Sequence, residues 1–145
     1  MKPQLAFYAS VAASLSLTSC LILPSTPRTV ITIRGSRDHA RDVAITKSVC
    51  DGVAARHQME LTPVQWGSPT IISYQKFFPG LFGGKSHGPP SIVLNSDSPD
   101  KVLVIVGGGM DYDGGRREVA DDIVPELERH FGKRVTSFND KWTEF

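Results

Sequence analysis

The chain contains little cysteine, almost no net charge and no repeated segment, and these shortages exclude several classes of protein. Only Cys20 and Cys50 occur among its 145 residues, too few for a scaffold that depends on several disulfides. Its 16 basic and 15 acidic residues give a formal net charge of +1 at pH 7. A nucleic-acid-binding domain usually carries a clear basic excess, so we expect no nucleic-acid partner.

Several motifs of catalytic and cofactor sites are also missing. Residues 83–86, Gly-Gly-Lys-Ser, end like a phosphate-binding loop, but Pro79 stands where the first glycine of that loop belongs. The Gly-x-Ser-x-Gly pattern of hydrolases does not occur. The four histidines show no paired spacing of the kind that zinc sites use. We therefore expect no cofactor.

The N-terminal segment is the most informative feature that is present. Lys2 is followed by an apolar stretch over residues 5–17, and two small residues then precede Cys20. A positive start, a short apolar stretch and a small-residue cleavage zone are typical of an export signal. With Leu17 at position −3 and a cysteine directly after the small residues, the segment resembles the lipobox of bacterial lipoprotein precursors.

The resemblance implies that the precursor is cleaved before Cys20, which then carries the acyl chains of the mature protein. One acyl chain binds a membrane only marginally, whereas the several chains of mature bacterial lipoproteins give a stable anchor. Residues 1–19 would be the signal peptide, residues 20–29 the lipidated cysteine and its tether, and residues 30–145 a single domain. The residue after the cysteine, position +2, is Leu21 and not aspartate. In lipoproteins of Gram-negative bacteria, the absence of aspartate at this position goes with transfer to the outer membrane, so the resemblance implies an outer-membrane location facing the periplasm if the host is Gram-negative.

Two other interpretations of this segment stay open. The apolar stretch could continue through Leu23 as an uncleaved membrane span, or Cys20 could be an ordinary small residue after a conventional signal. Whether the segment is a lipoprotein signal or an uncleaved membrane span, Lys2 favours an N-terminus inside the cytoplasm, so the domain is expected outside the cytoplasm. If Cys20 is acylated, Cys50 has no partner for an intrachain disulfide. Its place on an apolar helix stripe predicts a buried thiol.

The rest of the sequence predicts alternating strands and helices. Runs of β-branched or apolar residues predict strands, and apolar residues at helical spacing predict two helices. Ser36 is expected to cap the first helix and Gly132 to end the second, which contains Pro125 and must kink there or begin anew. The expected elements are strands at 28–34, 70–78, 91–95, 101–106 and 133–138, an extended segment at 59–66, helices at 37–57 and after 115, and a loop at 79–90.

This order suits an α/β (α+β) two-layer sandwich in which two helices cover one face of a mostly antiparallel sheet, and we expect a ferredoxin-like topology. The first helix would bury a stripe that includes Ala40, Ala44, Cys50 and Val53. The run at residues 102–106 does not alternate, which predicts a central strand buried on both faces. Many unrelated activities use this fold, so it does not identify one.

The glycine-rich stretch at residues 107–115 contains a candidate metal site. Asp111 and Asp113 stand in an Asp-Tyr-Asp-Gly-Gly sequence that is similar to the start of a calcium loop. The third acidic ligand and the closing glutamate of such a loop are missing. The other interpretation, which we favour, is a strand-to-helix turn whose acidic residues are stabilised by the helix dipole.

Four large apolar residues suggest a contact surface. Phe77, Phe78, Leu81 and Phe82 crowd a stretch that is rich in glycine and proline. Exposed apolar clusters of this kind often contact a partner protein or a membrane. Alternatively, these side chains cover the open face of the sheet, opposite the helices.

Together these features predict a membrane-anchored envelope lipoprotein whose domain is a small binding or scaffolding module. Its expected partners are the membrane, through the lipid anchor, and another envelope protein. The alternative is a tethered envelope enzyme of hydrolase type, with Asp111 and Asp113 as the first acidic residues to suspect. An enzyme predicts a concave pocket in which acidic residues converge, whereas a binding module predicts a flat or convex apolar patch.

Overall fold

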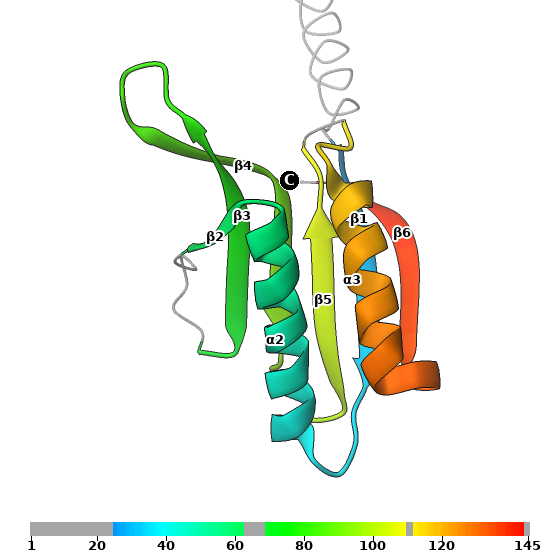
Figure 1. The fold of residues 1–145 in the computed structure, drawn as a ribbon. Coiled ribbons are helices and arrows are strands. Elements are labelled where there is room, and N and C mark those ends of the chain that lie inside the picture. The colour runs from blue at the N-terminus through cyan, green and yellow to red at the C-terminus, as the bar shows by residue number, and fades with distance from the viewer. Residues whose placement is uncertain (1–24, 63–68, 110–111, 144–145) are drawn as a thin grey trace, which may run out of the picture.

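The computed structural model describes residues 25–62, 69–109 and 112–143, which form a two-layer α+β sandwich (Figure 1). Two helices lie side by side on one face of a six-stranded sheet, so the expected fold class is confirmed. The elements are β1 (Ser25–Arg34), α2 (His39–Arg56), β2 (Met59–Thr62), β3 (Ile71–Pro79), β4 (Lys85–Asn95), β5 (Lys101–Gly107), α3 (Arg116–Phe131), the 3-10 turn η1 (Gly132–Arg134) and β6 (Val135–Thr143).

The sheet has the strand order β2-β3-β4-β5-β1-β6, and every neighbouring pair is antiparallel. Without β2 and β3, the chain runs β1-α2-β4-β5-α3-β6 with the sheet order β4-β5-β1-β6, which is the ferredoxin-like arrangement. The β2–β3 pair is therefore an insertion after α2 that widens the sheet at one edge.

The core lies between the helices and one face of the sheet. In β5, Val102, Val104 and Val106 are fully buried beneath the helices, whereas Leu103 and Ile105 point to the other face and are half-buried. The strand is central, as predicted, but the prediction that both of its faces are buried is wrong. No helix covers the second face in the described part of the chain.

Helix α2 buries a different stripe in its first half from the one that its alanines predict. Ala40 and Ala44 are exposed, whereas Asp42 and Thr46 are buried and Cys50 follows them on the same face. The cap is Asp38 rather than Ser36, because the Asp38 carboxylate accepts the backbone N–H of Arg41 at 3.0 Å. Two polar residues thus occupy core positions that a purely hydrophobic pattern cannot assign.

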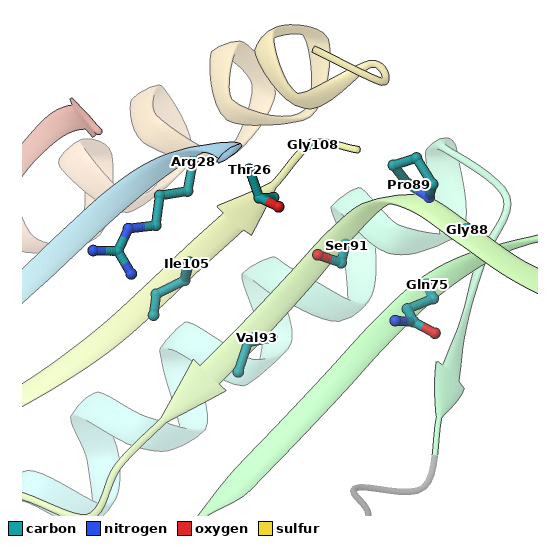
Figure 2. A pocket seen from close by; sticks show the side chains of 10 residues that line it. Thr26, Arg28, Gln75, Gly88, Pro89, Ser91, Val93, Ile105 and Gly108 are labelled. Atoms are coloured by element: carbon teal, nitrogen blue, oxygen red, sulfur yellow. The ribbon is translucent and has the colours of Figure 1, made fainter. Parts of the chain in front are cut away.

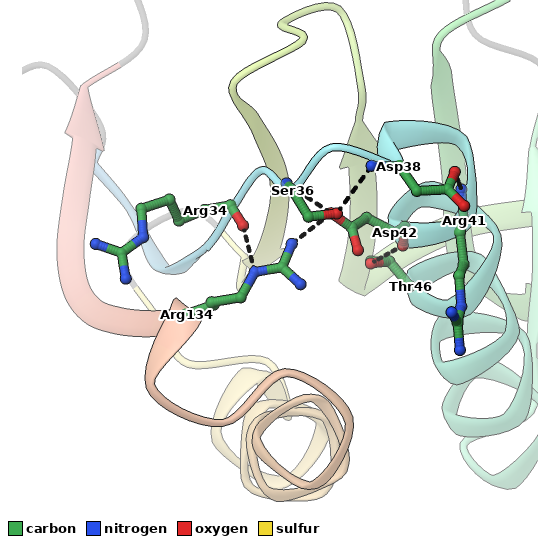
Figure 3. A network of polar contacts seen from close by, with 7 residues as sticks. All are labelled: Arg34, Ser36, Asp38, Arg41, Asp42, Thr46 and Arg134. Atoms are coloured by element: carbon green, nitrogen blue, oxygen red, sulfur yellow. Dashed lines mark hydrogen bonds and ion pairs between the residues drawn. The ribbon is translucent and has the colours of Figure 1, made fainter.

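Asp42 is buried at one end of the sandwich because three donors surround its Oδ2 atom (Figure 3). The backbone N–H and the hydroxyl of Ser36 donate to it at 3.0 and 2.8 Å, and Arg134 donates a third hydrogen bond. Arg134 also donates from Nε to the carbonyl oxygen of Arg34 at 2.8 Å. Burial alone would raise the pKa of Asp42, but the bonds and charge of Arg134 and the bonds from Ser36 lower it below its usual value.

Helix α3 has the predicted apolar stripe, which includes Val119, Ile123 and Leu127, all fully buried. The helix continues through Pro125 instead of beginning again there, and the ring lies on the exposed side. Gly132 ends the helix with a φ of 56°, and its N–H bonds the carbonyl of Glu128, as predicted for a glycine cap.

Two predicted irregular segments are strands. Residues 85–90 belong to β4, so the predicted loop at 79–90 is reduced to a tight turn between β3 and β4. Residues 25–29 belong to β1 and pair with the end of β6, with Ser25 opposite Thr143, so the predicted tether is shorter than expected. Prolines at 27, 89 and 90 made both segments look irregular, and a strand accepts proline where its N–H is not needed by the ladder.

Candidate binding site on the open face of the sheet

The face of the sheet opposite the helices carries a mixed row of side chains at one end. Arg28 lies opposite Gly107, Gly107 opposite Ser91, and Ser91 opposite Gln75. Side chains alternate along each strand, so these residues share one face, while their neighbours point toward the helices. We call this the open face.

A cavity of about 480 Å³ occupies this end of the open face (Figure 2). Val93 and Ile105 form its apolar floor, with Arg28 at one border and Gln75 near the other. Its lining, drawn from β1, β3, β4 and β5 and the residue after β5, consists of Thr26, Arg28, Gln75, Gly88, Pro89, Ser91, Val93, Ile105, Gly107 and Gly108.

Missing side chains and a change of register create the cavity. A Cβ on Gly107 would lie 2.7 Å from the Ser91 hydroxyl oxygen, so this glycine leaves room in the floor. Gln75 pairs with Ser91 but Lys76 pairs with Gly88, so β4 carries two extra residues there. Such a bulge bends a strand and increases its twist. Beyond it, β3 and β4 leave the sandwich as a projecting two-stranded hairpin (Figure 1).

The charges at the cavity are already balanced. The Arg28 guanidinium donates from Nη2 to Asp140 Oδ2 at 2.8 Å, and both side chains are partly exposed. Gln75 and Ser91 add uncharged hydrogen-bonding groups. A half-open cavity with an apolar floor and such a border can hold an apolar side chain and bond polar groups next to it.

The four predicted contact residues lie on the projecting hairpin and do not cover the open face as a group. Leu81 and Phe82, in its turn, are 99% and 102% exposed. Phe78 is 42% exposed and packs over Gly88, because a Cβ there would meet its ring at 2.9 Å. Phe77 lies 4.2 Å from the ring of His87, centroid to centroid. The interpretation of these residues as a covering cluster is therefore wrong for the two in the turn.

Asp113 lies just before α3 and contacts residues of the first turn of this helix. Its Oδ1 atom lies 3.1 Å from Arg116 Nη2 and 3.6 Å from Arg117 Nε. Asp111, the other predicted metal ligand, lies outside the described residues. Within the described ranges, no three His, Cys, Asp or Glu side chains gather as a metal site. The position of Asp113 matches the turn interpretation, in which acidic residues stabilise a helix start.

Arg116 itself ties α3 to the sheet. Its side chain is 7% exposed, and its Nη1 atom donates to Thr29 Oγ1 at 2.5 Å and to Asn139 Oδ1 at 2.8 Å. A second, polar hollow of about 330 Å³ lies beside it, between α3 and β6. The surrounding bonds give this arginine a structural role, because they join α3 to β1 and β6.

Besides Asp42, three groups with shifted pKa values form a separate cluster between α2 and β3. Burial raises the pKa of Cys50 to about 12. The Tyr74 hydroxyl donates to Asp51 at 2.5 Å, and burial together with this bond raises the tyrosine pKa. Burial would raise the pKa of Asp51, but hydrogen bonds from Lys47 and Tyr74 lower it. None of these residues lines the cavity on the open face.

Cys20, the predicted lipidation site, also lies outside the described residues. In the described part of the chain, no helix has the length and apolar character needed to cross a bilayer. No family model matches the chain, and no curated protein is significantly similar to it.

Proposed function

We propose that the protein is an envelope lipoprotein, anchored through acyl chains on Cys20, whose domain binds a short segment of another envelope protein. The cavity on the open face carries this proposal. An apolar side chain of the ligand would rest on Val93 and Ile105. Its backbone or polar groups would hydrogen-bond Gln75 and Ser91.

The character of the lining supports binding rather than catalysis. The cavity is concave, where a binding module was expected to be flat or convex, but none of the acidic side chains in the described residues lines it. Arg28 is its charged lining residue, and Asp140 already pairs with it. The alternative of a tethered hydrolase depended on Asp111 and Asp113. Asp113 forms ion pairs with Arg116 and Arg117. Nothing observed in the described residues favours the hydrolase.

The binding site can be tested by site-specific photocrosslinking in intact cells of the native host. A photoreactive amino acid replaces Ser91 in the cavity, and in a control it replaces exposed Glu128 on α3, away from the open face. We expect a discrete protein adduct from position 91 only. Ile105→Lys, which places a charge on the apolar floor, should abolish this adduct. Equal adducts from both positions, or none from position 91, would refute the binding site.

The anchor is tested separately by the mass of the mature N-terminal peptide. Acyl chains on Cys20 are expected, and Cys20→Ser should leave an unprocessed precursor. A cleavage elsewhere would refute the anchor without affecting the crosslinking result.

A further inference from the structure

We propose that the turn of the β3–β4 hairpin inserts Leu81 and Phe82 into the headgroup region of the membrane that anchors the chain. This inference rests on the proposed lipid anchor and adds a second membrane contact to it. Leu81 and Phe82 expose essentially their whole side chains on a hairpin that projects from the sandwich (Figure 1). Removing water from this exposed apolar surface lowers the free energy of the protein.

The hairpin turn lies at the same end of the sheet as the start of β1. A row of paired residues crosses the sheet at this end: Asp140, Arg28, Gly107, Ser91 and Gln75. Chain direction places β1 residues before Arg28, and β3 residues after Gln75, beyond the same side of this row. Figure 1 shows the hairpin extending past the end where β1 begins. The start of β1 and the apolar turn therefore lie toward the same side of the sheet.

The lengths permit both to reach one surface. From Gln75 to Pro79 the hairpin extends about 13 Å, at about 3.3 Å per residue, before the turn begins. Arg28 lies eight positions after Cys20 in the chain, and eight residue steps span at most about 29 Å when fully extended. An acylated Cys20 therefore leaves enough chain for the turn to touch the bilayer. The same chain is too short for the domain to move far from it.

The chemistry of the hairpin suits an anionic lipid surface. Residues 76–88 include Lys76 and Lys85 but no aspartate or glutamate. The Lys85 side chain lies directly after the turn and is 70% exposed, and its Nζ atom is 3.7 Å from Glu60 Oε2 on β2. Basic groups beside an apolar tip favour anionic headgroups. Within the turn, the N–H groups of Gly80 and Gly83 bond the carbonyls of Gly84 and Gly80, which lowers the cost of shallow insertion.

A membrane fits this tip better than a protein partner does. An aromatic side chain buries about 150–250 Å². Leu81 and Phe82 together thus offer roughly 400 Å² or less, about half of the ~800 Å² that each partner contributes to a stable protein interface. A lipid surface needs no matching shape, so two apolar side chains on a narrow turn suffice there.

Depth-dependent fluorescence quenching tests the insertion. The processed protein carrying Leu81→Cys is labelled with an environment-sensitive nitrobenzoxadiazole dye, reconstituted into phosphatidylethanolamine–phosphatidylglycerol vesicles, and exposed to nitroxide-bearing lipids. Cys50 is buried and does not compete for the dye. We expect blue-shifted, quenched emission at position 81. A dye at Lys133→Cys, exposed at the opposite end, should be neither shifted nor quenched.

A matched pair of variants measures how much the apolar side chain of Phe82 contributes to insertion of the turn. Adding Phe82→Ser to the labelled protein should lower the ratio of inserted to free turn about tenfold or more, since a buried aromatic side chain is lost. Adding Leu61→Ser, which removes an exposed leucine on β2, should leave the ratio unchanged. Equal effects of the two substitutions would overturn the proposal.

The mass of the N-terminal peptide, measured on the same sample, separates the two proposals. An acylated Cys20 with an unquenched dye at position 81 would overturn the insertion and leave the anchor standing. A bare Cys20 would overturn the anchor. Because its thiol would also take the dye, the measurement is then repeated with Cys20→Ser added, and a quenched dye at position 81 would support the insertion. A dye that is unquenched on vesicles but shielded in native envelopes would assign the turn to a protein partner and overturn the membrane contact.

Discussion

Replacing the buried carboxylate of Asp42 by an amide should destabilise the fold markedly although the change is nearly isosteric. In Asp42→Asn, an amide NH2 group replaces one of the two carboxylate oxygens, and the negative charge that faces Arg134 is lost. Breaking a buried ion pair typically costs about 3–5 kcal/mol. The Arg134 side chain is 28% exposed, so water compensates part of this loss, and we expect about 2–3 kcal/mol. Urea unfolding of the full chain in detergent at pH 7, followed by circular dichroism, measures the loss.

Two further variants show whether the network is the cause. Asp38→Asn changes an exposed carboxylate that only caps α2, and asparagine caps equally well, so it should cost less than about 0.5 kcal/mol. Arg134→Gln combined with Asp42→Asn completes a double-mutant cycle, whose coupling energy should be about 1–2 kcal/mol. Additive effects, or equal costs for the two aspartates, would refute the assignment of Asp42 as an electrostatic anchor.

The pH dependence has a definite sign. The folded pKa of Asp42 lies below its unfolded value of about 3.8. The folded state therefore binds fewer protons than the unfolded state in the interval between them, and stability rises with pH there. The contribution of Asp42 is fully present above this interval and is lost as the pH falls through the folded pKa. The difference between wild type and Asp42→Asn should accordingly be large at pH 6 and shrink at acid pH.

Two other predictions test the division between core and surface. Leu127→Ala should lower the free energy of unfolding by about 2–5 kcal/mol because Leu127 is fully buried, whereas Leu81→Ala should change it by less than about 0.5 kcal/mol; similar costs in urea unfolding would contradict the packing. The raised pKa of Cys50, about 12, keeps the thiol protonated at pH 8. A disulfide exchange reagent should therefore modify Cys50 slowly in the native protein and rapidly in denaturant, and equal rates would show that the thiol is accessible.

The hydrophobic patterns of the sequence were sufficient to predict that two helices cover one face of the sheet. The stripe through Val119, Ile123 and Leu127 and the apolar run of β5 predict one helix and the central strand. The order of strands and helices then predicts the ferredoxin-like topology. These signals are local and strong because each buried side chain recurs at the period of its own element.

Features that depend on distant partners could not be predicted in the same way. Asp42 looks like a surface residue, and its burial becomes favourable because Ser36 and Arg134, 92 positions later, donate hydrogen bonds to it. Residues 85–90 look like a loop because of their glycine and prolines, and pairing with β3 makes them a strand. An alternating pattern such as Arg28, Val30 and Thr32 could have indicated a second, partly polar face, but it does not show which strands lie beside it.

The cavity was missed for the same reason. Gln75, Ser91 and Gly107 are unremarkable along the chain and meet only across three strands. The apolar residues of the hairpin were found, because four large side chains in so short a stretch are visible in composition. Their exposure was left open in the sequence and follows from the projection of the hairpin.

The pairing of Ser25 with Thr143 has a practical consequence for anyone who wishes to label this protein. A reporter fused behind β6 would emerge next to the first strand. In the proposed anchored state it would be pressed against the lipid and would compete for space with the hairpin. The β4–β5 turn at residues 96–100 lies at the far end of the sheet. A tag inserted there would point into the open compartment, where an antibody or a binding partner could reach it.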